Sequence, residues 1–306
     1  MKTNTKRIST LLTALLALVS SQVMAKPVTV EHMFGTTELE SKPQRVVVMG
    51  IGPLDALDYF GIDPVAVSTS AVTPDYLKKY TQGYASSGSL HEPDFESIFT
   101  QKPDLIITGP RASESYKELS EIAPTVVFAI DNKKGYWPET QKQWRMLGKI
   151  FEIEDMVEAK ITNVDAKFSA IRSNNQSSDY DALTVMSSGG NISTFGPGSR
   201  FAVIYSDFGF KENVQAVKAK THGDLISYEF IREKNPSTLL VLDKDALFNP
   251  DNSTAAAEFA NDLIKTTKAY QQNRIAFLDM DAWYLAIAGV TATDQMINDV
   301  SGVSAN

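Results

Sequence analysis

Short apolar runs alternate along the first half of the chain with stretches whose apolar positions recur every three or four residues. The apolar runs, typical of buried strands, lie at residues 45–49, 64–67, 104–108 and 125–128. The stretches with helical spacing lie between them, at residues 53–59, 95–101 and 112–122. This alternation of strands and helices predicts a mainly parallel sheet with helices on both faces.

A long helix is predicted for the middle of the chain. Residues 139–173 contain no proline and a single glycine, Gly148, and their apolar positions keep a three- and four-residue spacing. The polar residues at 174–178 then end the pattern. We therefore predict one continuous connecting helix over residues 139–174.

The alternation of strands and helices resumes after this helix. Strand-like runs lie at residues 182–187, 192–194, 238–242 and 275–278, and helical spacing at residues 201–208, 228–234 and 254–269. Residues 92–107 and 227–242 share one phrase: a helix with a glutamate, then Lys-Pro or Asn-Pro, then an apolar strand. We predict an α/β fold of two Rossmann-like lobes with mainly parallel sheets, residues 26–138 and 175–306, joined by one long helix. A conventional hinge protein with two crossovers is the alternative.

The N-terminus has the pattern of a signal peptide over residues 1–25. Its basic residues, which no acidic residue accompanies, are Lys2, Lys6 and Arg7. The apolar run at residues 8–19 follows, and then Val-Met-Ala at 23–25, a signal-peptidase pattern. The apolar core, roughly 10–12 residues, is too short to span a bilayer core of about 30 Å. No cysteine follows for lipid attachment, so we expect an unanchored protein in the periplasm.

The amino-acid composition and the net charge exclude several classes of function. The absence of cysteine excludes disulfides, thiolate catalysis and zinc–sulfur sites. The formal charge is −8, and removal of the three basic residues of the signal peptide gives −11, which argues against binding nucleic acid or an anionic membrane surface. An acidic protein that binds an anion therefore needs a locally positive pocket.

With these features, the chain resembles the helical-backbone class (class III) of periplasmic substrate-binding proteins, which deliver iron-siderophores, haem and cobalamin to ABC importers. The resemblance covers nearly all of the mature chain, and its most specific marks are residues 92–107, the long helix and the repeated phrase. Within the class, the chain looks most similar to the catecholate-siderophore binders. The resemblance implies a ferric catecholate siderophore as cargo, an ABC permease as partner, no permanently bound cofactor and no enzymatic activity. We expect a monomer that is not inserted in the membrane.

Ferric iron prefers catecholate and phenolate oxygens and accepts imidazole. A tetradentate bis-catecholate leaves two positions of octahedral iron open, which one imidazole and one phenolate would fill. The resemblance assigns these roles to His222, in a polar loop of the second lobe, and to Tyr284, in the loop after the last predicted strand. The remaining histidines, His32 and His91, are expected to be surface or structural residues.

Three cations at strand or turn ends complete the expected ligand-binding set. Arg111 follows the strand at 104–108, Arg200 follows a Gly-Pro-Gly-Ser turn, and Lys244 follows the strand at 238–242. Open α/β sheets bind ligands at the carboxyl ends of their strands, and such cations form charge-assisted hydrogen bonds with catechol oxygens. The similar proteins carry an arginine in place of Lys244, and a lysine lacks the bidentate fork of that arginine.

Glu96 and Glu229 occupy matching places in the repeated phrase. In the class that the chain resembles, one acidic residue of each lobe docks onto arginines of the permease, which implies that role here. Solvated helix glutamates are the alternative.

Other functions remain open at this stage. A haem- or cobalamin-binding protein of the same fold is one, because a single Tyr or His can ligate haem axially. A periplasmic hydrolase that uses His222 with a serine is another, although residues 196–200 do not form a nucleophile elbow and no P-loop or dinucleotide fingerprint occurs. Three scattered histidines supply a zinc or manganese site poorly.

Overall fold

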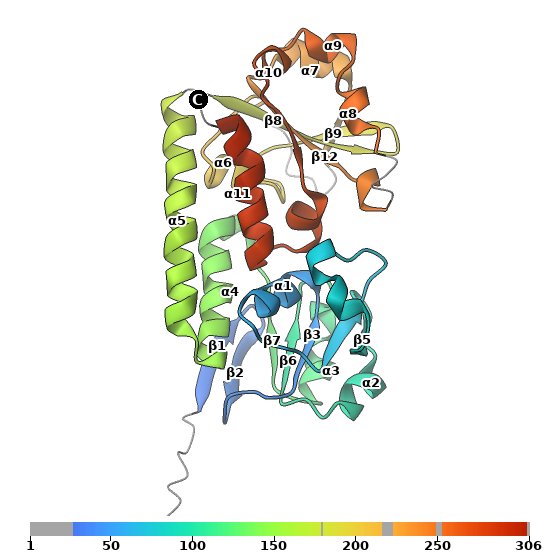
Figure 1. Ribbon diagram of the computed structural model, residues 1–306, viewed down its shortest axis with the longest axis vertical. Helices are drawn as coiled ribbons and strands as arrows, with labels where there is room; N and C mark the ends of the chain where they lie inside the picture. Colours follow the sequence, from blue (N-terminus) through green and yellow to red (C-terminus); the bar gives the residue numbers. More distant parts are fainter. Residues whose placement is uncertain (1–26, 179, 216–222, 249–252, 305–306) are drawn as a thin grey trace, which may run out of the picture.

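The computed structural model describes residues 27–178, 180–215, 223–248 and 253–304. Two α/β lobes lie along the long axis of the molecule, with the helices α4 and α5 on one side of them (Figure 1). The predicted fold class is confirmed, whereas the predicted signal peptide lies outside the described residues. Within the described ranges, the search for a helix long and apolar enough to cross a bilayer finds none.

The first lobe is built on a parallel sheet in the order β5-β4-β3-β6-β7. Its strands are β3 (Val46–Met49), β4 (Ala66–Thr69), β5 (Ala85–Ser89), β6 (Leu105–Thr108) and β7 (Thr125–Val127). Its helices are α1 (Ile51–Tyr59), α2 (Phe95–Thr100) and α3 (Tyr116–Ser120), and the hairpin of β1 (Val28–His32) and β2 (Gly35–Leu39) precedes the sheet. Every residue of β3 and β6 is buried, as expected for strands covered on both faces.

The second lobe has a mixed sheet in the order β11-β9-β8-β12-β13, with β10 also paired to β8. Its strands are β8 (Asp181–Ser188), β9 (Asn191–Phe195), β10 (Lys211–Glu212), β11 (Asp224–Ile226), β12 (Thr238–Asp243) and β13 (Ile275–Leu278). Its helices are α6 (Val203–Ser206), α7 (Tyr228–Lys234), α8 (Ala255–Glu258), α9 (Asp262–Lys265), α10 (Lys268–Gln271) and α11 (Val290–Ser304). The central strands β8, β12 and β13 run parallel, and β9 is antiparallel to β8.

The helical spacing over residues 254–269 corresponds to three short helices, α8, α9 and α10, and not to one continuous helix. Side chains restart the helix twice. Asn261 accepts hydrogen bonds from the amides of Leu263 and Ile264, and Thr267 accepts one from the amide of Tyr270. Both residues sit at N-cap positions, where Asn and Thr satisfy amides that lack a partner within the helix.

The predicted continuous helix over residues 139–174 is wrong. The structure has α4 (Tyr136–Phe151) and α5 (Glu154–Ser177), which pack side by side (Figure 1). Glu152 takes the left-handed conformation with φ 53°, and the Gly148 carbonyl accepts hydrogen bonds from the amides of Glu152 and Ile153. This left-handed cap reverses the chain. The long helix that joins the lobes is α5, whose 24 residues span about 36 Å.

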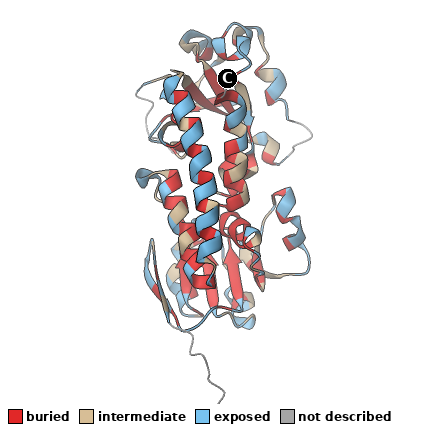
Figure 2. Ribbon diagram, turned by 60° about the vertical axis from the view of Figure 1, so that its left-hand side comes forward, coloured by how far each residue is buried: buried red, intermediate tan, exposed pale blue. Residues whose placement is uncertain are grey.

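An aromatic core ties α4 and α5 to the second lobe. Trp137 meets Trp144 at 5.3 Å between ring centroids and stacks on Phe168 of α5 at 5.2 Å, and Phe168 contacts Phe208 at 4.8 Å. The Trp144 indole donates a hydrogen bond to the Ala288 carbonyl (2.8 Å). In Figure 2, α5 lies at the front with an exposed outer face, and buried residues lie behind it. A movement of the lobes relative to each other would expose part of this apolar surface, at a free-energy cost of about 25 cal/mol per Å². We therefore expect the lobes to move little when a ligand binds.

Asp55 of α1 caps the first turn of α11 and so links the two lobes. Its carboxylate accepts hydrogen bonds from the amides of Thr291 (2.8 Å) and Ala292 (2.9 Å) and from the Tyr76 hydroxyl (2.6 Å). A Cβ at Gly289 would lie 2.5 Å from the Asp55 Cγ, so only glycine permits this approach. A carboxylate is favourable at a helix N-terminus, but Asp55 is fully buried, and this burial raises its pKa to about 6 despite the hydrogen bonds.

We predict that Asp55 makes the stability of the protein rise as the pH falls. Since its pKa in the folded state is higher than the ordinary 3.8, the folded state binds a proton first, and this contribution is lost as the pH rises through about 6. From pH 7.5 to 5, the wild type should gain roughly 1.4 kcal/mol in free energy of unfolding relative to Asp55→Asn, measured by urea titration. Parallel pH profiles for the two proteins would contradict the prediction.

Candidate functional site

Loops that follow strands of both lobes bring four of the predicted residues into one inter-lobe cleft. Arg111, Lys244 and Tyr284 line a cavity of about 460 Å³. Arg111, Arg200 and Tyr284 line an adjoining cavity of about 550 Å³. Arg111 comes from the first lobe, after β6, and the others come from the second lobe, so the cavities lie between the lobes. This is the place where open α/β sheets bind ligands.

The two arginines converge on Tyr284. The Nη2 atom of Arg111 donates a hydrogen bond to the Tyr284 main-chain carbonyl at 3.2 Å, and Nη2 of Arg200 donates to the same oxygen at 3.4 Å. The Arg200 guanidinium carbon also lies 4.1 Å from the centroid of the Tyr284 ring, within cation–π range. A single carbonyl oxygen is thus the meeting point of one cation from each lobe.

A π-helical turn at Asp281–Leu285 holds Tyr284 in this position. The Ala286 amide donates to the Asp281 carbonyl (2.8 Å), which closes the turn. Trp283 is buried, and its indole donates to Asp299 of α11 (2.8 Å), whereas the next residue, Tyr284, is half-buried and lines both cavities. The turn therefore anchors one aromatic side chain in the core and presents the next to the cleft. Single π-turns are frequent at functional sites.

Among the described residues, no carboxylate balances the positive charge of the cleft. In the described part of the chain, no Asp or Glu oxygen lies within 4.0 Å of the charged nitrogens of Arg111, Arg200 or Lys244. Burial lowers the pKa of both guanidiniums from the ordinary value, and the charge of Arg111 lowers that of Arg200 further. Both still carry their charge at neutral pH, because an arginine is not deprotonated in proteins. The arrangement can attract and hold an anion.

Sequence reasoning missed other polar residues of the cleft. Lys133 and Asn132, on the turn after β7, line the 550 Å³ cavity beside Arg200. His91, on the loop after β5, lines the 460 Å³ cavity beside Lys244. The signal that identified Arg111, its place after a strand, applies equally to these loops. The run at residues 125–128, before Lys133, has the apolar pattern of a strand, whereas the small residues of Ala85–Ser89, before His91, do not.

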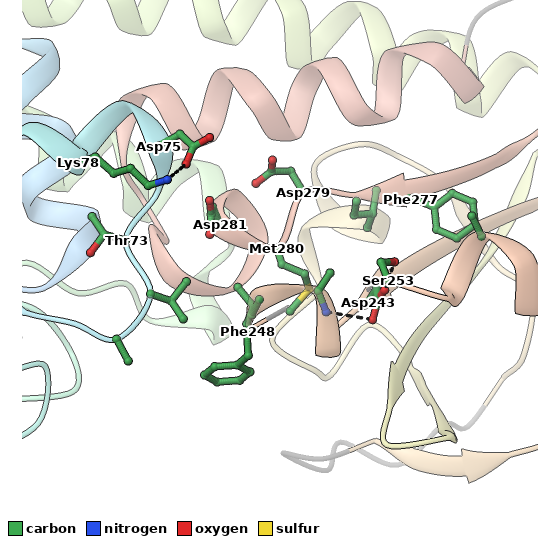
Figure 3. Close-up of a pocket in the computed structure, with 16 residues that line it drawn as sticks. Thr73, Asp75, Lys78, Asp243, Phe248, Ser253, Phe277, Asp279, Met280 and Asp281 are labelled. Carbon is green, nitrogen blue, oxygen red and sulfur yellow. Dashed lines mark hydrogen bonds and ion pairs between the residues drawn. The ribbon is translucent and has the colours of Figure 1, made fainter. Parts of the chain in front are cut away.

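A third cavity, of about 720 Å³, shares Val72 and Phe248 with the 460 Å³ cavity but has an acidic lining (Figure 3). Among the described residues that line it, the acidic ones are Asp75, Asp243, Asp279 and Asp281, and the one lysine, Lys78, is paired with Asp75 at 2.6 Å. Burial and, after it, the neighbouring Asp279 raise the pKa of Asp281 to about 6. This lining repels an anion, so the smaller cavities around Tyr284 are the candidate ligand site.

Of the three histidines, the structure describes His32 and His91. His91, expected to be a surface or structural residue, is exposed and lines the 460 Å³ cavity. His222 lies outside the described residues; the residue after it, Gly223, packs against Thr194 and Phe195 at the end of β9. His32 is half-buried, and its Nε2 is hydrogen-bonded to the Thr37 hydroxyl (2.9 Å), which fits the expected structural role. In the described part of the chain, no three His, Asp or Glu residues are grouped so as to hold a metal ion.

Glu96 and Glu229 lie in the first turns of α2 and α7, and both are exposed. The two helices lie far apart along the long axis, one in each lobe, away from α5 (Figure 1). Asp94 caps α2 and Ser227 caps α7, so the local structure of the repeated phrase is the same in both lobes. A hydrogen bond with Ser227 lowers the pKa of Glu229 from its ordinary value.

Known proteins share this architecture over nearly the whole chain. The crystal structure of the periplasmic catecholate-siderophore binding protein VctP from Vibrio cholerae matches with a TM-score of 0.87 and 58% identity, over 90% of this chain and 100% of that chain. The structure of the siderophore-binding protein BauB, bound to two acinetobactin molecules and ferric iron, matches with a TM-score of 0.83 and 32% identity, over 91% and 99%.

Sequence comparison leads to the same group. The petrobactin-binding protein YclQ of Bacillus subtilis (strain 168) is 36% identical over 284 residues, which cover 92% of this chain and 89% of YclQ. The family model described as "Periplasmic binding protein" matches residues 46–282, which include both sheets and the arginines that meet at Tyr284. The chain therefore belongs to the periplasmic binding protein family.

Proposed function

We propose that this protein is a periplasmic substrate-binding protein, not an enzyme, that captures a ferric catecholate siderophore between its lobes and delivers it to an inner-membrane ABC importer. The observation that carries the proposal is the meeting of Arg111 and Arg200 at Tyr284 with no carboxylate in reach among the described residues. The names of the relatives VctP and YclQ support a siderophore as the cargo.

The chemistry of the cleft suits a ferric catecholate because the complex is anionic and rich in oxygen acceptors. Guanidinium and ammonium groups form charge-assisted hydrogen bonds with such oxygens. Arg111, Arg200 and Lys244 supply these groups from three different loops. A lysine binds as a point charge and not as a planar fork, so we expect Lys244 to tolerate more than one orientation of a catechol.

Two side chains are proposed as direct iron ligands for a tetradentate cargo. Tyr284 lines both cavities next to the arginines, and its phenolate oxygen is a donor that ferric iron prefers. His222 is proposed on sequence grounds alone. A hexadentate chelate already fills the six positions of the iron, so it would rely on the cations and not on these two residues.

The partner in transport is proposed to be the ABC permease. Glu96 and Glu229 offer one exposed carboxylate at each end of the molecule, in the same local setting. Arginines of a permease at matching separation would bind both at once, and this double contact raises the effective affinity without a large interface. The predicted signal peptide supports delivery from the periplasmic side.

Tyr284→Phe should weaken binding of a tetradentate ferric bis-catecholate about tenfold or more, equivalent to about 1.4 kcal/mol, and should shift its charge-transfer band. The substitution keeps the ring over Arg200 and removes only the oxygen. Fluorescence titration and visible spectroscopy provide the measurements, with Tyr270→Phe, an exposed tyrosine outside the two cavities around Tyr284, as the control. An unchanged spectrum and affinity would remove Tyr284 from the iron ligands.

His222→Ala should weaken the tetradentate complex and leave a hexadentate ferric catecholate nearly unaffected, because the second chelate offers the iron no open position. Parallel titrations of both complexes measure the difference. Equal loss for both, or loss for neither, would count against His222 as an iron ligand.

A double variant that reverses the charge of both proposed docking residues, Glu96→Lys with Glu229→Lys, should lose siderophore uptake in cells. Its binding of the siderophore in solution should stay intact. The matched control reverses Glu118 and Glu154, which are also exposed first-turn glutamates, on α3 and α5. The control makes the same change in net charge at helix starts. Transport that survives the first pair, or fails equally in the control, would show that Glu96 and Glu229 are ordinary solvated charges.

A further inference from the structure

Tyr284 and Arg111 form a wall between two chambers of the cleft, since both residues line each of them. We name the chambers by the lysine of each. The Lys244 chamber, about 460 Å³, is also lined by His91, Leu90, Val72 and Phe248. The Lys133 chamber, about 550 Å³, is also lined by Arg200, Asn132, Phe128 and Ile130. Each chamber is large enough for a small organic group, because ligand pockets commonly measure roughly 300–1,000 Å³.

Lys133 differs from the lysine next to it in a way that suits a ligand contact. Asp131 accepts a hydrogen bond from the Lys133 amide (3.0 Å), which fixes the turn at Asn132–Lys134, and its carboxylate pairs with the Lys134 ammonium at 3.7 Å. Lys133 lines the chamber and has no carboxylate within ion-pair distance in the described ranges, whereas Lys134 is paired and lines neither chamber. The ammonium of Lys133 is therefore available to an anion.

The two chambers combine apolar walls with cations in the same way. Apolar surface on which an aromatic ring can pack comes mainly from Ile130 in the Lys133 chamber and from Phe248 in the Lys244 chamber, since Phe128 and Leu90 are buried. A lysine in each chamber, and the arginines at the wall, offer partners to ionised oxygens on that ring. A planar aryl group that carries adjacent phenolate oxygens fits such a lining better than an aliphatic chelating group does.

We infer that each chamber takes one aryl arm of a two-armed chelate, with the iron beside Tyr284, and that Lys133 binds the phenolate oxygens of the arm in its chamber. The inference rests on the proposed function and assigns a residue that determines its specificity. Lys244 has the corresponding task in the other chamber. The cleft thus discriminates between cargoes by the number and spacing of their charged aryl arms.

The experiment measures tryptophan fluorescence quenching by the ferric complex of a synthetic tetradentate bis-catecholate, at low and at high salt. The variants are Lys133→Glu, Lys133→Arg, which keeps the charge, and Lys134→Glu, which makes the same change in net charge one residue away. Circular dichroism checks the fold of each variant. High salt screens long-range attraction, with a Debye length near 3 Å at 1 M, and leaves direct contacts.

Lys133→Glu should weaken binding at least about tenfold at both salt concentrations, because it removes a charge-assisted hydrogen bond. Lys133→Arg should stay within about threefold of the wild type, and Lys134→Glu should have no effect at high salt. If the arms are separate, the losses from Lys133→Glu and Lys244→Glu should multiply in the double variant, as for independent sites.

Equal affinities of Lys133→Glu and Lys134→Glu at high salt, with a wild type that binds the complex, would overturn the role of Lys133 and leave the proposed function intact. A double variant no weaker than the worse single variant would overturn the two-chamber arrangement. A folded wild type that does not bind the ferric catecholate would overturn the proposed function, and the inference with it.

Discussion

The main-chain oxygen of Tyr284 accepts hydrogen bonds from a guanidinium of each lobe, and the rest of the cleft depends on this junction. It fixes the π-turn that presents the Tyr284 side chain, and it holds two cations close together although they repel each other. Burial makes that repulsion costly. In the described ranges, no carboxylate lies beside either guanidinium. The protein itself therefore does not offset the repulsion between the two cations with those residues. An anionic ligand would offset it, and binding energy can be gained in this way without any large movement.

The scaffold around the junction keeps the two cations in place. The helix α5 and the aromatic cluster of Trp137, Trp144 and Phe168 connect the lobes through buried surface. Asp55 joins the start of α11 to the first lobe within a few residues of Tyr284. These contacts favour a cleft that is largely formed before the cargo arrives, and preorganisation of this kind lowers the entropic cost of binding.

Much of this arrangement could be predicted from the sequence, because it follows from strand positions. The three predicted cations come after recognisable strands or turns, and the structure brings them together with Tyr284. They are Arg111, Arg200 and Lys244. The break between α4 and α5 could not be predicted. Neither Gly nor Pro occurs at residues 151–154, the apolar spacing continues through them, and Glu152 takes a left-handed conformation that is uncommon for its type.

The residues that sequence reasoning missed depend on tertiary contact. Lys133 follows a predicted strand just as Arg111 does, and His91 follows a strand that lacks an apolar pattern, but only the packing of the two lobes decides which residues after a strand lie in the cleft. Asp55 looks like an ordinary helix aspartate until Thr291 and Ala292, more than 230 positions away, donate to it. Local patterns predict elements and their ends, whereas long-range pairings decide which of those ends share a cavity.

The most direct test of the account is a set of fluorescence-quenching titrations of the mature protein with a ferric catecholate, a ferric hydroxamate, haem and cobalamin under one set of conditions. We predict saturable quenching by the anionic ferric catecholate and much weaker binding of the other three, because the catecholate complex places several anionic oxygens directly around the iron, where the cations at Tyr284 can reach them. Tight binding of haem, cobalamin or the hydroxamate, with little affinity for the catecholate, would contradict the account.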